Sequence, residues 1–80
     1  MTEAEQMRHR ILSKLSENVA TFAVPVGAYL GTEGQEALEW MLHNRWLTLI
    51  DISPLATDTD HLYRIFLASD EAVTWYRKQL

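Results

Sequence analysis

The feature that most constrains this chain is a change of residue pattern near Trp46. Before it, apolar residues recur at the spacing of an amphipathic helix. Residues 46–52 and 62–67 are instead aliphatic, aromatic and β-branched, which is typical of strands. The mostly polar residues 53–61 lie between these two runs and include Pro54. The pattern predicts an α+β fold in which helices flank a two-stranded hairpin with a long loop.

Capping signals place the first and last helices. Thr2, followed three residues later by Glu5, forms a capping-box pattern and predicts a helix over residues 3–17. Ser69 is suited to cap a C-terminal helix that carries Arg77 and Lys78 in its last turn, where cations interact favourably with the helix dipole. The residues expected to face the core are Ala4, Met7, Ile11 and Leu15 in the first helix and Val73, Tyr76 and Leu80 in the last.

Two further helices are predicted between these ends. Residues 18–24 are compatible with either a helix or a strand, but Pro25 suits the first position of a helix because it needs no amide donor there. We therefore expect a short helix over residues 25–30, a turn at Gly31 with positive φ, and a longer helix over residues 33–45. Its inward side chains are expected to be Ala37, Trp40 and Met41.

Composition limits the chain to one small domain. Its 80 residues are 48% hydrophobic and contain no cysteine, so residues 1–80 must be stabilised by packing or by self-association. No apolar run approaches the ~20 residues that span a bilayer, and the N-terminus is acidic. These observations predict a cytoplasmic protein without a membrane partner.

The segment from Pro25 to Leu42 resembles a helix-turn-helix. Val26 and Leu30 match the buried positions of its first helix, Gly27 the small residue where the helices cross, and Gly31 the turn glycine. Ala37 and Trp40 match the inward positions of the second helix. With the hairpin and the C-terminal helix, the chain is similar to the winged helix-turn-helix superfamily, which implies three helices, a hairpin with a long wing, and a closing helix.

The residue charges oppose the DNA-binding role that the resemblance offers. The formal net charge is −4, and Glu33, Glu36 and Glu39 occupy the exposed side of the second helix, where DNA readers carry cations or amides. The loop adds Asp58 and Asp60. A DNA-binding transcriptional regulator is therefore the alternative function, and its candidate nucleic-acid contacts are Arg8, Arg10, Lys14, Gln35, Arg45 and Arg64.

Protein–protein contact is the leading interpretation. The apolar arc of the helix over residues 33–45 is wider than one core face needs, so Leu38 or Leu42 should reach the surface. The candidate contact residues are Gln35, Leu38, Glu39 and Leu42. The other interpretation is that both leucines complete a wide core face. A homodimer is the simplest partner, because a self-complementary patch needs no other gene product.

No sequence motif points to catalysis or to a cofactor. The histidines His9, His43 and His61 fall in separate elements, and no serine lies in a nucleophile elbow. Asp58, Asp60 and His61 could converge on a metal, but alternating residues in a loop are more often a solvated surface. We expect a non-enzyme that requires no cofactor and no metal.

Overall fold

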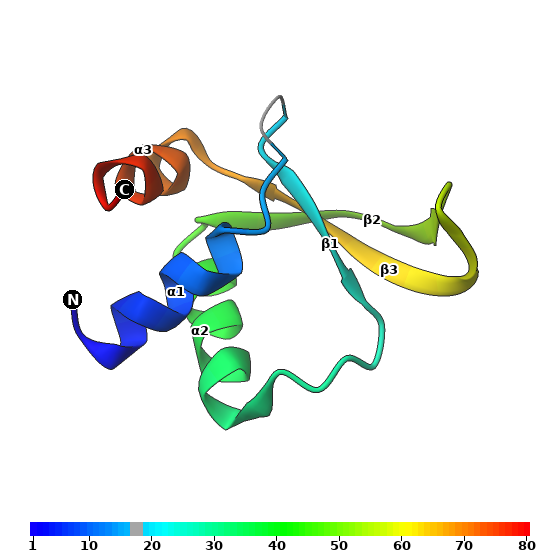
Figure 1. Ribbon diagram of the computed structural model, residues 1–80, viewed down its shortest axis with the longest axis horizontal. Coiled ribbons are helices and arrows are strands. Elements are labelled where there is room, and N and C mark those ends of the chain that lie inside the picture. The colour runs from blue at the N-terminus through cyan, green and yellow to red at the C-terminus, as the bar shows by residue number, and fades with distance from the viewer. Residues whose placement is uncertain (17–18) are drawn as a thin grey trace.

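The computed structural model describes residues 1–16 and 19–80 and confirms the α+β class. The elements follow the order α1 (Glu3–Leu12), β1 (Thr21–Pro25), α2 (Gly31–His43), β2 (Leu47–Leu55), β3 (Asp58–Ala68) and α3 (Asp70–Lys78). The strands form one antiparallel sheet in the order β1-β3-β2. In Figure 1, α1 and α2 lie on one side of the sheet, and the far end of the hairpin extends away from both helices.

Both predicted caps are confirmed. The Thr2 side chain accepts from the backbone of Glu5 while the Glu5 carboxylate accepts from the Thr2 backbone, and Ser69 accepts from the Ala72 backbone. The first helix nevertheless ends at Leu12, because Ser13 closes it with backbone bonds to preceding carbonyls. The predicted end of that helix at Glu17 lies outside the described residues, as does Asn18 of the ambiguous stretch. Leu80, expected to face the core, is 81% exposed.

The predicted helix over residues 25–30 is wrong. Residues 21–25 instead form β1, in which Phe22 pairs with Phe66 and Val24 pairs with Arg64 of β3. The Ala28 amide then donates to the Pro25 carbonyl, and Gly27 takes a φ of 83°, as a type II turn requires at its third position. Burial of Phe22 and Val24 on the sheet therefore outweighs the suitability of Pro25 for a helix start.

The second helix and the hairpin are displaced from their predicted bounds. Gly31 has the expected positive φ, 72°, but α2 already begins at this residue and ends before Arg45, whose own φ is 60°. The prediction of a long loop over residues 53–61 is wrong. Strand β2 continues to Leu55, strand β3 begins at Asp58, and Leu55 pairs with Asp58. The hairpin is also not alone, since β3 pairs with β1 on its other side.

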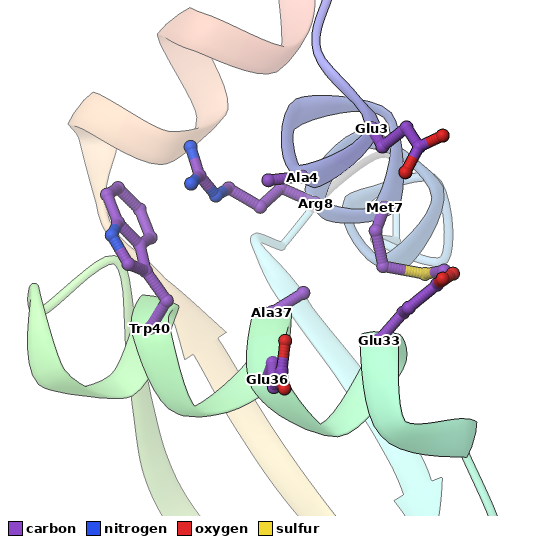
Figure 2. A pocket seen from close by; sticks show the side chains of 8 residues that line it. All are labelled: Glu3, Ala4, Met7, Arg8, Glu33, Glu36, Ala37 and Trp40. Atoms are coloured by element: carbon purple, nitrogen blue, oxygen red, sulfur yellow. The ribbon is translucent and has the colours of Figure 1, made fainter.

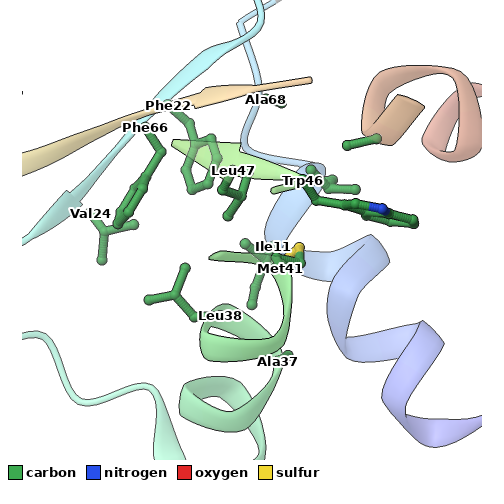
Figure 3. Packing of buried hydrophobic residues seen from close by; sticks show 12 residues of the cluster. Ile11, Phe22, Val24, Ala37, Leu38, Met41, Trp46, Leu47, Phe66 and Ala68 are labelled. Atoms are coloured by element: carbon green, nitrogen blue, oxygen red, sulfur yellow. The ribbon is translucent and has the colours of Figure 1, made fainter. Parts of the chain in front are cut away.

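The core lies between α1, α2 and the helix side of the sheet (Figure 3). Leu12, Leu38, Met41 and Phe66 are its largest fully buried side chains. The Phe22 ring stacks on that of Phe66 with the centroids 5.4 Å apart. Because strand-paired residues share a face, this stack defines which side of the sheet the helices cover.

Aromatic side chains hold α3 against the rest of the chain. The Trp46 ring lies 5.3 Å from that of Trp75 and 5.2 Å from that of Trp40. His9 of α1 packs 4.7 Å from the ring of Tyr76. These contacts join α1, the end of α2 and α3 through apolar surface.

Candidate protein-binding surfaces

The contact residues predicted on α2 separate into surface and core. Gln35 and Glu39 are exposed and joined by a 3.3 Å hydrogen bond from the Gln35 amide to the Glu39 carboxylate. Leu42 is 37% exposed, whereas Leu38 is 1% exposed and packs below Val24 and Phe66 (Figure 3). The prediction that Leu38 contacts a partner is therefore wrong, because its side chain fills the space between α2 and the sheet.

The predicted cations do not gather on one element. Arg10 of α1 and Lys14, which follows that helix, line one shallow depression together with Leu30 and Gly34. Arg8 lines a different cleft, on the side of α1 that faces Trp40. Arg45 follows the end of α2. Arg64 lies within β3, in the register row that joins Val24 to Ile52.

An apolar surface covers the end of the sheet that the helices leave open. Leu49 pairs with Phe66, and Ile52 pairs with Arg64, so both side chains share the helix side of the sheet with the core. They are 43% and 51% exposed, and Leu62, which alternation places on the same side, is 52% exposed. Leu42 follows Leu38 by about one helical turn and so also faces the sheet. We name Leu42, Leu49, Ile52 and Leu62 the hairpin face.

Arg64 gives the hairpin face a charged centre. Its guanidinium Nε is enclosed and has no hydrogen-bond partner. A donor that the chain encloses and leaves without an acceptor costs free energy, and because the atom is enclosed, an acceptor on a partner's surface does not reach it. Glu39 borders the same surface on α2, next to Leu42 in the helix, and is exposed. Neither Arg64 nor Glu39 forms an ion pair within 4 Å among the described residues, where Asp58 and His61 form the one such pair.

The cleft that Arg8 lines lies between α1 and α2 (Figure 2). It has a volume of about 440 Å³. Ala4, Met7, Ala37 and Trp40 make its floor apolar, while its charged lining residues are Glu3, Glu33, Glu36 and Arg8. The Arg8 guanidinium carbon lies 3.7 Å from the centroid of the Trp40 ring, a cation–π contact. We name this hollow the α1–α2 cleft.

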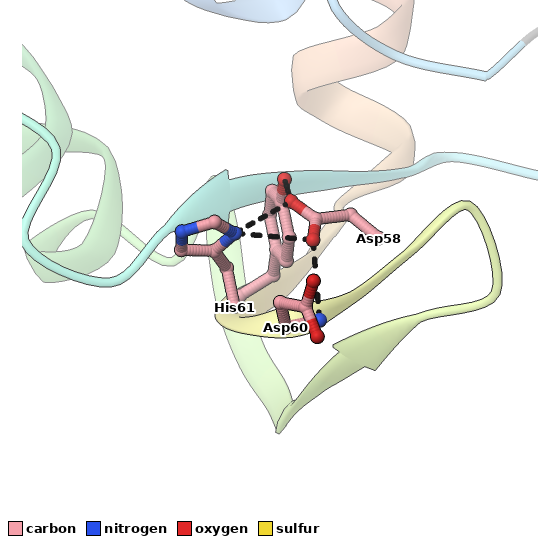
Figure 4. A network of polar contacts seen from close by, with 4 residues as sticks. Asp58, Asp60 and His61 are labelled. Carbon is pink, nitrogen blue, oxygen red and sulfur yellow. Dashed lines mark hydrogen bonds and ion pairs between the residues drawn. The ribbon is translucent and has the colours of Figure 1, made fainter.

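A small polar network closes the hairpin tip (Figure 4). Asp58 Oδ2 accepts a 2.8 Å bond from the Tyr63 hydroxyl and lies 3.0 Å from Nδ1 of His61. The hydrogen bond from Tyr63 is the largest cause that lowers the pKa of Asp58, and the bond from His61 is the next. The Tyr63–Asp58 bond also raises the pKa of Tyr63. Within residues 1–16 and 19–80, no three histidine or acidic side chains are placed to hold a metal ion. The network orders the tip through hydrogen bonds.

Sequence reasoning missed both the hairpin face and the cleft. Residues 46–52 were predicted as a strand, but simple alternation places Leu49 and Ile52 on opposite sides, and the irregular register between Leu49 and Asp51 brings them to the same side. Which part of the sheet α2 covers depends on the three-stranded pairing. The cleft depends on how α1 crosses α2, which no local pattern determines.

Comparison with models of protein families, with curated protein sequences and with solved structures finds no match to this chain. In the part of the chain that the structure describes, no helix has the length and apolarity needed to cross a membrane. The function is therefore argued from the surfaces themselves.

Proposed function

We propose that the chain is a cytoplasmic, non-enzymatic module of winged-helix type that acts through protein–protein contacts and assembles with a second copy of itself. The hairpin that extends past the helices and the helix α3 that follows it support the winged-helix resemblance. The turn at Pro25–Ala28 takes the place of the first helix of the helix-turn-helix.

The hairpin face carries this proposal. It exposes three aliphatic side chains on the helix side of the sheet, Leu49, Ile52 and Leu62, together with Leu42 on α2. Continuous exposed apolar surface with a polar border is typical of contact sites between proteins. Addition of a strand at the sheet edge is less favourable, because β2 has an irregular register between Leu49 and Asp51 and carries Pro54. Packing of face against face suits this surface better.

Charge complementarity favours a second copy as the partner. Each chain carries a cation, Arg64, within the hairpin face and a carboxylate, Glu39, at its border, and neither forms an ion pair within residues 1–16 and 19–80. In a two-fold contact the surface of one copy meets the same surface of the other, so the Arg64 of each copy can reach the Glu39 of its partner.

Sedimentation equilibrium tests this assembly with a matched pair of variants. Leu49 and Leu67 are both 43% exposed, but they lie on opposite sides of the sheet, since Leu67 pairs with Thr48. We expect Leu49→Asp to weaken dimerisation by at least about thirtyfold, while Leu67→Asp leaves it unchanged and both variants stay folded by circular dichroism.

Two outcomes would reject the assembly. The first is a wild-type chain that stays monomeric at millimolar concentration, and the second is equal weakening by the two variants. Fluorescence anisotropy with duplex DNA then tests the alternative function, a DNA-binding transcriptional regulator. Binding tighter than the ~10⁻⁶ M of non-specific contacts, lost when Arg10 and Lys14 are replaced by Ala, would favour a DNA-binding regulator.

A further inference from the structure

The α1–α2 cleft is independent of the hairpin face, with which it shares no residue. Its floor is apolar, and three of its lining residues are carboxylates, Glu3, Glu33 and Glu36. Figure 2 shows Glu3, Met7 and Glu33 at one end of the cleft, and Arg8 extended toward Trp40 at the other. The cleft therefore has an acidic end and an aromatic end.

The carboxylates at this cleft have no cationic partner in the part of the chain that the structure describes. Among the described residues, the ion pair within 4 Å is that of Asp58 with His61, so Glu3, Glu33 and Glu36 are all unpaired. Arg8, which lines the same cleft, is directed to the ring of Trp40. Neighbouring carboxylates repel one another, and a cation placed among them relieves that repulsion.

The floor matches the other half of a basic side chain. Arginine and lysine carry an aliphatic stem below a charged head, and they cover apolar surface with the stem while the head stays polar. Ala4 and Ala37 leave room for such a stem because their side chains are small. The contact of Arg8 with Trp40 shows that this cleft already accommodates one guanidinium on an apolar wall.

We infer that the α1–α2 cleft binds an arginine or lysine side chain from a basic segment of a partner protein. The stem packs on Ala4 and Ala37, and the head lies among the carboxylates of Glu3, Glu33 and Glu36. Arg8 competes with this head for the negative potential of the cleft. The partner proposed for the cleft is a basic segment of another protein. The proposed dimer contact uses the hairpin face instead, so the two partners occupy different surfaces.

Isothermal titration with a nine-residue peptide of alanine and arginine, and with its isosteric citrulline analogue, tests the charge of the ligand. The arginine peptide is expected to bind and the citrulline peptide to bind at least about tenfold more weakly. Replacing Glu33 and Glu36 together by Gln should weaken binding by about fivefold or more, whereas Glu71→Gln on α3 should not. Arg8→Gln should strengthen it, because the competing cation is removed.

The location of binding needs a steric variant. Binding of the arginine peptide in the cleft should shift the indole N–H resonance of Trp40. Ala4 is exposed, so Ala4→Leu should leave the chain folded. Its larger side chain should fill the floor of the cleft, and the peptide should then no longer shift the Trp40 resonance. Equal binding of the two peptides, or equal weakening by Glu71→Gln, would overturn the inference. So would free arginine binding as tightly as the peptide, since the ligand would then be the free amino acid. None of these outcomes affects the sedimentation of Leu49→Asp.

Discussion

The Tyr63 hydroxyl donates a 2.8 Å hydrogen bond to Oδ2 of Asp58 at the tip of the β2–β3 hairpin. This bond stabilises the ionised carboxylate and lowers the pKa of Asp58. The resulting stabilisation is fully present above the pKa that Asp58 has in the unfolded chain, and it is lost as the pH falls through the lower folded value. The hairpin tip should therefore loosen under acid conditions.

Replacing Tyr63 by Phe tests this relationship. We expect the pKa of Asp58 to rise toward its ordinary value, because the largest stabilising bond to the carboxylate is removed. Carboxyl ¹³C shifts of Asp58 followed over pH measure the change directly. Tyr29→Phe is the control, since Tyr29 is 91% exposed. An unchanged Asp58 titration in Tyr63→Phe would show that the bond does not form in solution.

A second prediction separates the two leucines of α2. Leu38→Ala should lower the free energy of unfolding by about 2–5 kcal/mol, because Leu38 is 1% exposed and its removal leaves a cavity. Leu42→Ala should cost less than about 1 kcal/mol, since Leu42 is 37% exposed. Urea unfolding at one low protein concentration measures both. Equal costs would mean that α2 presents a different side to the sheet.

The contrast between these leucines also shows how far sequence reasoning could go. The wide apolar arc of α2 indicated that one of them should reach the surface, but Leu38 and Leu42 lie on the same side of a helix. Leu38 is covered because Val24 and Phe66 lie above it, and Leu42 is exposed because it is closer to the helix end. That difference depends on long-range packing, which the spacing of residues along α2 does not contain.

Local signals were reliable where a side chain bonds to the nearby backbone. Thr2 and Ser69 cap α1 and α3 as predicted. Pro25 misled because its fixed φ also suits the end of an edge strand, and pairing of β1 with β3 decides between the two. The hairpin turn was missed for a similar reason, since residues 53–61 look like a loop until Leu55 pairs with Asp58.

The last prediction concerns the two charges proposed to meet across the dimer. Arg64→Glu alone places a second carboxylate opposite Glu39 of the other copy, and Glu39→Arg alone places two cations together. Each single variant should therefore weaken dimerisation by about tenfold, whereas the double variant should recover most of the loss because an opposite-charge pair is restored. Sedimentation equilibrium at two salt concentrations measures the effect, and added salt should reduce it.

Glu71→Arg provides the control for net charge, because it makes the same change as Glu39→Arg on α3, away from the hairpin face. Circular dichroism must show that Arg64→Glu remains folded, since Arg64 is partly buried. If the losses of the two single variants simply add in the double variant, Arg64 and Glu39 do not meet. The apolar contact of Leu49 and Ile52 would then have to hold the dimer in an orientation that keeps Arg64 and Glu39 apart.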